Sequence, residues 1–292
     1  MSCFTAFSFI GDVCHVLSIL LLLRRLHATR NAQGISLRTQ ELYLLVFVSR
    51  YINLPVAFHG LYRGLFALSP LAAYILFLKV FLLSSTAGIV YAIRWKEPIC
   101  STCDLVQDDF RHVEFAILPC FLVATLNHIY SRQGDGLGSL SNVQMLLWDF
   151  SVCLEAVAIL PQLYLLRRYN SVENLTGNYV FFNGAYSLFY GLSWVYKAYY
   201  EVGYRHNYLM EACGGLQVVL YGEFFYYWFK SKKSGRALKY GEGGETEYYD
   251  CDVKELRGHV NSSPLIDKSD IRRRGKSVSN VSVETGVSIG EG

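Results

Sequence analysis

The chain has 292 residues, of which 52% are hydrophobic, 15% aromatic and only 17% charged. These values fit a protein that crosses a membrane several times better than they fit a soluble domain. The net charge of +3 is small, and we expect the lipid bilayer as a partner, with no nucleic acid, cofactor or metal.

Seven apolar segments of membrane-spanning length follow one another along the chain. They cover Cys3–Leu23, Glu41–Leu61, Leu71–Ile93, His112–Tyr130, Val143–Leu166, Gly177–Tyr200 and Tyr208–Phe229. We therefore predict an all-α membrane protein with seven transmembrane helices within residues 1–230. After about Ser231 the chain becomes rich in Gly, Ser, Glu and Lys, so residues 231–292 are predicted to form a disordered cytosolic tail.

The distribution of basic residues predicts the orientation in the membrane. Fourteen lie in the first, third and fifth connections or just after the last segment: Arg24, Arg25, Arg30, Arg38, Arg94, Lys96, Arg111, Arg167, Arg168, Lys230, Lys232, Lys233, Arg236 and Lys239. The other connections hold three, which are Arg63, Arg132 and Arg205. This asymmetry places the C-terminus in the cytosol and the N-terminus on the opposite side, as seven crossings require.

The fifth apolar segment carries a carboxylate near its centre, Glu155, and the pair Pro161-Gln162 further on. Helical spacing puts Met145, Trp148, Glu155 and Gln162 on one face. A carboxylate at membrane depth is costly unless it is paired or faces a wet cavity. The segment is therefore either a buried helix with one satisfied glutamate or one wall of a polar cavity.

Three other segments carry polar stripes at helical spacing. The members are Ser8, Asp12 and His15 in the first, Arg50 with Tyr51 and Asn53 in the second, and Tyr186, Tyr190, Ser193, Trp194 and Lys197 in the sixth. Arg50, Lys197 and His15 set against Glu155 leave a surplus of positive charge, which suits an anionic ligand and carboxylates above all. The chain contains no catalytic motif, so we expect a protein that is not an enzyme.

An ordered series of motifs resembles the receptors for lumenal proteins of the endoplasmic reticulum, the KDEL receptors. The run from Cys153 to Leu163, CLEAVAILPQL, is similar to the signature of that family. The remaining matches occur in the same order: Gly11-Asp12 with His15, Gly34-Ile35-Ser36 with Gln40, Arg50-Tyr51, Val113-Glu114-Phe115 with Pro119, and Tyr221 to Phe225. The resemblance extends from about Phe4 to Phe229.

The resemblance implies a fold similar to the PQ-loop and SWEET transporters, with two three-helix bundles joined by helix 4. It implies a receptor of the endoplasmic reticulum and cis-Golgi membranes that captures the C-terminal tetrapeptide of escaped lumenal proteins and returns them by retrograde transport. The N-terminus would then be lumenal.

The resemblance also implies a role for several residues, and we expect Tyr190 and Trp194 of the sixth segment to complete the peptide site. Arg50 with Tyr51 would take the terminal carboxylate of the peptide, and Lys197 would meet its acidic side chains. Trp148 would pack on the peptide, and Glu155 would partner the cation at Lys197. His15, beside Tyr186, would sense pH.

Four positions of the expected peptide site depart from the family. Ser8 and Lys197 stand where the family has arginines, although Lys197 keeps the charge. Asn53 and Met145 stand where it has the two carboxylates that serve the first lysine of the tetrapeptide. We therefore expect this chain to accept an apolar or neutral first residue.

The basic patch Lys230, Lys232 and Lys233 has two interpretations. Ligand capture could expose it to coatomer, or it could act as a plain membrane anchor. A SWEET-like small-solute transporter is the main alternative for the whole protein, because it shares the architecture and a midplane site. A seven-helix signalling receptor is a third and weaker one.

Overall fold

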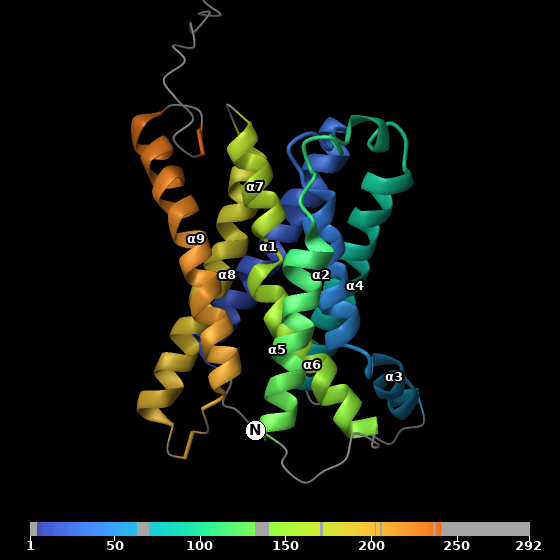
Figure 1. Cartoon of the computed structure of the whole chain (residues 1–292), viewed down its shortest axis with the longest axis vertical. Helices are drawn as coiled ribbons and strands as arrows, with labels where there is room; N and C mark the ends of the chain where they lie inside the picture. Colours follow the sequence, from blue (N-terminus) through green and yellow to red (C-terminus); the bar gives the residue numbers. More distant parts are fainter. Residues whose placement is uncertain are drawn as a thin grey trace, which may run out of the picture. The chain divides into compact units, whose positions relative to one another are not determined.

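The computed structural model describes residues 5–62, 70–131, 140–169, 172–201, 203–204, 206–235 and 238–240. Within these ranges the fold is all-helical (Figure 1). The elements are α1 (Ala6–Thr29), α2 (Leu37–Arg50), α3 (Leu54–Tyr62), α4 (Pro70–Trp95), the 3-10 turn η1 (Cys100–Thr102), the π-helical turn η2 (Val113–Ile117), α5 (Leu118–Ser131), α6 (Leu140–Val157), α7 (Leu160–Arg168), α8 (Asn174–Tyr200) and α9 (Tyr208–Ser234).

Four helical stretches of the described residues are long and apolar enough to cross a membrane. They are Ala6–Thr29, Pro70–Trp95, Val113–Tyr130 and Asn142–Arg168. Large apolar side chains such as Phe77, Leu122 and Val219 stand exposed on the outside of the helices, as on a surface that faces lipid. The helical character of all seven predicted segments is confirmed, whereas the number of crossings stays a prediction.

Two of the predicted segments are broken helices, and a proline follows each break. The second segment stops at Arg50 and resumes as α3 at Leu54, one residue before Pro55. The fifth stops at Val157 and resumes as α7 at Leu160, one residue before Pro161. Proline lacks an N–H and its ring clashes with the carbonyl four residues earlier, which interrupts a helix. The predicted common face of Met145, Trp148, Glu155 and Gln162 is therefore cut between Glu155 and Gln162.

The helices pack so that both broken segments face the same interior. α1 packs against α8 and α4, while α2 packs against α4, α6 and α7. α6 in turn contacts α5 and α9, and α8 contacts α9. The end of α2 and the end of α6 consequently lie in contact, and they bring Arg50 and Glu155 together.

The chain beyond α9 is ordered further than predicted. α9 runs to Ser234, and Val172 pairs with Leu238 in an isolated antiparallel bridge, with its N–H 2.8 Å from the Leu238 carbonyl. Leu238 and Tyr240 are each only 3% exposed, and the Tyr240 ring lies against Phe224. The described structure thus continues past the predicted boundary at residue 231, with apolar side chains buried after it. The predicted disordered tail from residue 241 onward lies outside the described residues, as do Arg63, Arg132 and Arg205.

Candidate functional site

An ion pair between Arg50 and Glu155 forms the centre of the candidate site. The Arg50 Nη2 lies 2.6 Å from the Glu155 Oε2, and both side chains are largely buried. The Arg50 Nε donates to the Ser151 Oγ at 3.1 Å, and that hydroxyl donates to the Trp148 carbonyl at 2.7 Å. Each buried charge therefore has a charged partner, and the guanidinium is held in a fixed orientation.

Tyr186 links this ion pair to the predicted pH sensor. Its hydroxyl donates to the Glu155 Oε1 at 2.7 Å, and its ring stacks on the imidazole of His15 with the centroids 4.2 Å apart. The Phe47 ring also lies near His15, with the ring centroids 5.8 Å apart. His15 is only 6% exposed, so a proton gained there would add charge directly beside Glu155 and Arg50.

A second carboxylate, Asp12, lies nearby and accepts two tyrosine hydroxyls. Tyr190 donates to its Oδ1 at 2.6 Å, and Tyr74 donates to its Oδ2 at 2.9 Å. The Tyr190 ring is in edge contact with Tyr186, with centroids 5.0 Å apart. A row of tyrosines thus connects the two carboxylates.

Two adjoining cavities open around these groups, each of about 380 Å³. The first is lined by Arg50, Trp148, Val152, Glu155, Tyr186, Ser187, Tyr190, Trp194, Lys197, Tyr204, Met210, Cys213, Gly214 and Gln217. The second is lined by Ser8, Asp12, His15, Phe47, Arg50, Tyr51, Leu71, Tyr74, Ile75, Leu78, Lys79, Leu82, Tyr186, Tyr190 and Lys197. They share Arg50, Tyr186, Tyr190 and Lys197, which stand at the boundary between them.

Most of the predicted site residues are brought together here, and two are not. Arg50, Tyr51, Trp148, Glu155, Tyr186, Tyr190, Trp194, Lys197, His15 and Ser8 line one or both cavities. Asn53 follows the end of α2 and Met145 is 38% exposed on α6, and neither lines these two cavities.

The hydroxyl of Ser8 is engaged in a closed set of contacts at the edge of the second cavity. It lies 2.8 Å from the Ser193 hydroxyl and 2.9 Å from that of Thr5, and these two hydroxyls are 2.7 Å apart. Ser8 therefore joins α1 to α8 with hydrogen-bonding groups already occupied.

The expected pairing of Glu155 with Lys197 is wrong. Glu155 pairs with Arg50 instead, because the break after Val157 and the end of α2 bring these two side chains face to face. Among the described residues Lys197 has no carboxylate within 4 Å, although it lines both cavities. Its ammonium is thus available to an acidic ligand.

Sequence reasoning missed Lys79 and Tyr74, both on α4. The Lys79 ammonium lies 5.6 Å from the centroid of the Tyr51 ring and lines the second cavity. The sequence did contain a sign that Lys79 belongs to the site. Lys79 is the one charged residue between Pro70 and Ile93, and a charge inside an apolar segment marks a functional position. With Lys79 and Asp12 counted, the cavities hold three fixed cations and two carboxylates, and the predicted surplus of positive charge remains.

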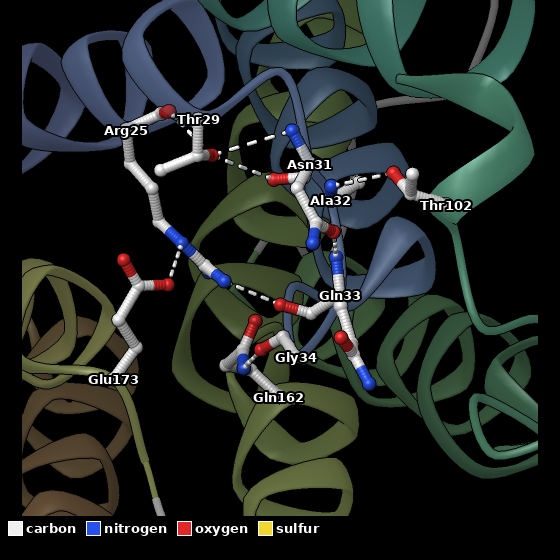
Figure 2. Close-up of polar contacts among 9 residues, drawn as sticks. All are labelled: Arg25, Thr29, Asn31, Ala32, Gln33, Gly34, Thr102, Gln162 and Glu173. Atoms are coloured by element: carbon white, nitrogen blue, oxygen red, sulfur yellow. Dashed lines mark hydrogen bonds and ion pairs between the residues drawn. The ribbon is translucent and has the colours of Figure 1, made fainter. Parts of the chain in front are cut away.

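Gln162, expected on the cavity face, instead fixes the loop before α2. Its side-chain carbonyl accepts the Ser36 N–H at 2.9 Å. Its amide donates to the Gly34 carbonyl at 2.9 Å (Figure 2). Its own N–H donates to the Thr39 hydroxyl at 2.9 Å. This amide has no exposed surface, and it anchors α7 to the start of α2.

The Arg25–Glu173 ion pair joins α1 to the start of α8 in the same region. The Arg25 Nε lies 2.7 Å from the Glu173 Oε2, and the guanidinium also donates to the Gln33 carbonyl (Figure 2). This pair lines a separate pocket of about 450 Å³ and lies outside both site cavities.

The three lysines of the predicted coat-binding patch lie at the end of α9, and all are exposed. The Lys230 ammonium is 5.8 Å from the centroid of the Tyr226 ring, and that of Lys232 is 5.5 Å from the Trp228 ring. Uncovering a buried patch is therefore not needed for recognition.

Comparison with known proteins identifies the family. A profile of the family described as ER lumen protein retaining receptor matches residues 31–197. An ER lumen protein-retaining receptor of Petunia hybrida is 38% identical over 233 residues, which cover 80% of this chain and 97% of the relative. Receptors of the same name from Plasmodium falciparum and Drosophila melanogaster are 35% and 34% identical, over 82% and 80% of this chain and 98% and 97% of their own lengths. The chain carrying this arginine–glutamate–tyrosine site therefore belongs to the ER lumen protein retaining receptor family.

Proposed function

We propose that this protein is the retrieval receptor of its secretory pathway, binding the C-terminal tetrapeptide of escaped lumenal proteins in the acidic Golgi and returning them to the endoplasmic reticulum. The observation that carries the proposal is Arg50. It lies at the end of a broken helix, oriented by Ser151 and Glu155, on the boundary of two cavities rich in cations. A guanidinium held in this way can take a terminal carboxylate through two parallel hydrogen bonds.

The proposal includes the architecture and placement in the membrane. Seven crossings in two three-helix bundles joined by α5 would place the N-terminus in the lumen and the C-terminus in the cytosol. Broken helices that meet at a ligand site are typical of membrane proteins with a midplane binding site. The receptor would reside in the membranes of the endoplasmic reticulum and the cis-Golgi.

A free carboxylate is the decisive requirement. The purified receptor should bind a peptide ending in a free acidic-acidic-Leu sequence at pH 5.5, and C-terminal amidation should weaken binding at least hundredfold. Equal binding of the acid and the amide would refute the proposal. Solute flux into proteoliposomes in the absence of peptide would favour a SWEET-like transporter instead.

Peptide affinity should fall as the pH rises through the titration range of His15. A proton gained by His15 would add a positive charge beside Tyr186, Glu155 and Arg50, in a site for an acidic peptide. The protonated form should bind more tightly, so His15→Ala should flatten the affinity profile between pH 5.5 and 7.5. His128→Ala, which alters another buried histidine, is the control and should leave the profile unchanged. A pH dependence that persists in His15→Ala would move the switch to Glu155.

The receptor should prefer Met over Lys at the first position of the tetrapeptide. Glu155 is occupied by Arg50 and Tyr186, Asp12 accepts the Tyr74 and Tyr190 hydroxyls, and Asp149 accepts the Asn127 amide at 3.0 Å. Each nearby carboxylate therefore already has hydrogen-bond partners. A desolvated ammonium without a charged partner costs several kcal/mol, whereas a methionine packs on the aromatic wall and gains about 1–2 kcal/mol from burial.

Competition at acidic pH between peptides ending Met-Asp-Asp-Leu and Lys-Asp-Glu-Leu tests this preference. Asn53 and Met145 lie just outside the cavities, three residues from Arg50 and Trp148 respectively. The double variant Asn53→Asp/Met145→Glu, which adds carboxylates there, should shift selectivity toward the lysine peptide. Asn53→Gln/Met145→Leu, which changes the same two positions without adding charge, is the matched control and should leave the selectivity unchanged. A tenfold advantage of the lysine peptide in the unmodified receptor, about 1.4 kcal/mol, would contradict the prediction.

Coatomer is the proposed cytosolic partner, through Lys230, Lys232 and Lys233. Replacing all three lysines with serine should trap the receptor in the Golgi while leaving peptide affinity unchanged. Fluorescence microscopy and a binding assay on the same variant measure the two effects. Lys96→Ser, another exposed lysine, should cycle normally. If the triple variant also cycles normally, the patch is a membrane anchor.

A further inference from the structure

Two thiols from different helices meet in the wall of the first cavity. The Sγ atoms of Cys153 on α6 and Cys213 on α9 are 3.9 Å apart, and both thiols are free. Cys153 is buried, whereas Cys213 is half-buried and lines the cavity. The pair is therefore shielded on one side and reachable by a small reagent from the other.

The position of this pair connects it to the binding groups. Cys153 lies between Ser151 and Glu155 in sequence, on the helix that supplies both partners of Arg50. Cys213 adjoins Gly214, where an added Cβ would overlap the Trp194 ring. α9 thus packs tightly against α8 at this level, and a bond from Cys213 to α6 would tie together three walls of the cavity.

We propose that Cys153 and Cys213 form a redox site, in which hydrogen peroxide converts the two thiols into a disulfide that lowers peptide affinity. The Cys213 sulfur, which faces the cavity, attacks one peroxide oxygen, the O–O bond breaks, and a sulfenic acid and one water are produced. The Cys153 sulfur then attacks the Cys213 sulfur, the S–O bond breaks, and the second water leaves. Two thiols and one peroxide give one disulfide and two waters, so atoms and electrons balance.

Closing the bond changes the cavity. The sulfurs must approach from 3.9 Å to about 2.05 Å, which draws α6 and α9 together at the level of Glu155. Because the packing of Gly214 on Trp194 restrains α9, part of the adjustment falls on α6, which carries Trp148 and Glu155. The effect on peptide affinity rests on the proposed function, whereas formation of the bond does not.

The test oxidises the full chain in nanodiscs with hydrogen peroxide, blocks the remaining thiols with N-ethylmaleimide and maps the peptides by mass spectrometry. A Cys153–Cys213 linked peptide that dithiothreitol reverses is expected, together with at least a fivefold loss of tetrapeptide affinity that reduction restores. Bound tetrapeptide should slow oxidation, because it occupies the cavity. Cys213→Ser should abolish both the linked peptide and the redox effect on affinity.

Two matched controls separate this pair from other thiols. Cys120→Ala removes a buried thiol of α5, which packs on the same α6, and Cys14→Ala removes one in α1; both should keep the Cys153–Cys213 bond. Two alkylated thiols after peroxide treatment would overturn the proposal, and a bond formed without change in affinity would overturn its regulatory part. If neither the reduced nor the oxidised receptor binds peptide, the proposed function fails while the mapped bond still decides the redox site.

Discussion

Replacement of Arg50 by alanine is expected to abolish tetrapeptide binding and to lower the free energy of unfolding by about 3–5 kcal/mol. The loss of binding follows because the guanidinium is the proposed partner of the terminal carboxylate. The loss of stability follows because Glu155, with its Oε2 2.6 Å from Arg50, would remain buried without a cation. Peptide affinity and thermal unfolding in detergent measure the two effects.

A second substitution separates them. Arg50→Ala/Glu155→Gln removes both charges, so most of the stability should return while binding stays absent. Arg50→Lys keeps a charge but loses the planar fork, and it should fold normally and bind at least tenfold more weakly. If the double variant binds peptide like the unmodified receptor, the terminal carboxylate lies elsewhere, and Lys197 becomes the next candidate.

The pair Arg25–Glu173 provides a matched control within the same chain. The Arg25 side chain is 4% exposed and ion-paired at 2.7 Å, yet it lies outside both site cavities. Arg25→Ala should therefore lower stability, as Arg50→Ala does, but the folded fraction should keep its peptide affinity. A comparable loss of affinity in both variants would indicate that each acts through folding alone.

Gln162→Leu is expected to destabilise the receptor strongly without removing any cavity group. The substitution keeps the size of the side chain but leaves the Ser36 N–H and the Gly34 carbonyl without their partners. Each unpaired buried group costs about 1–3 kcal/mol, so a loss of roughly 2–6 kcal/mol follows. Size-exclusion chromatography after heating and thermal unfolding should both report it.

Gln217→Leu is the control for this change. Gln217 is also buried in a helix, at 6% exposure, but among the described residues its Nε2 donates to no acceptor. Its loss should change the free energy of unfolding by less than about 1 kcal/mol, because no formed hydrogen bond is broken at that nitrogen. Equal destabilisation by the two glutamine substitutions would show that the Gln162 hydrogen bonds contribute little.

Most of the ionisable groups of the site could be predicted from the sequence, because an ionisable side chain inside an apolar segment is costly and therefore informative. Arg50, Glu155 and Lys197 stood out for that reason. Their pairing could not be predicted, since it depends on how far each helix is rotated and on where it breaks. The resemblance pointed to Lys197 as the partner of Glu155, whereas the geometry supplies Arg50.

The fold likewise has features that the sequence predicts and features that it does not. The positions of the helices follow from the apolar segments. The two breaks before Pro55 and Pro161 were not predicted, although proline is known to interrupt a helix. The role of Gln162 was hidden, because its partners Gly34 and Ser36 lie more than 120 residues earlier in the chain. Until those partners are known, the position of Gln162 on its helix is equally consistent with a cavity-lining side chain and with a structural anchor.

The short segment that returns over the end of α9 determines where a reporter can be attached. Leu238 rests against Gly177, and the Tyr240 hydroxyl donates to Glu223 at 3.2 Å. A fluorescent protein or purification tag fused directly after Ser234 would remove these contacts. It would leave apolar side chains exposed to water at the start of α8 and the end of α9. A fusion placed after Tyr240 would retain this segment. Trafficking measured with that fusion would therefore report on a receptor in which Leu238 and Tyr240 still cover the end of α9.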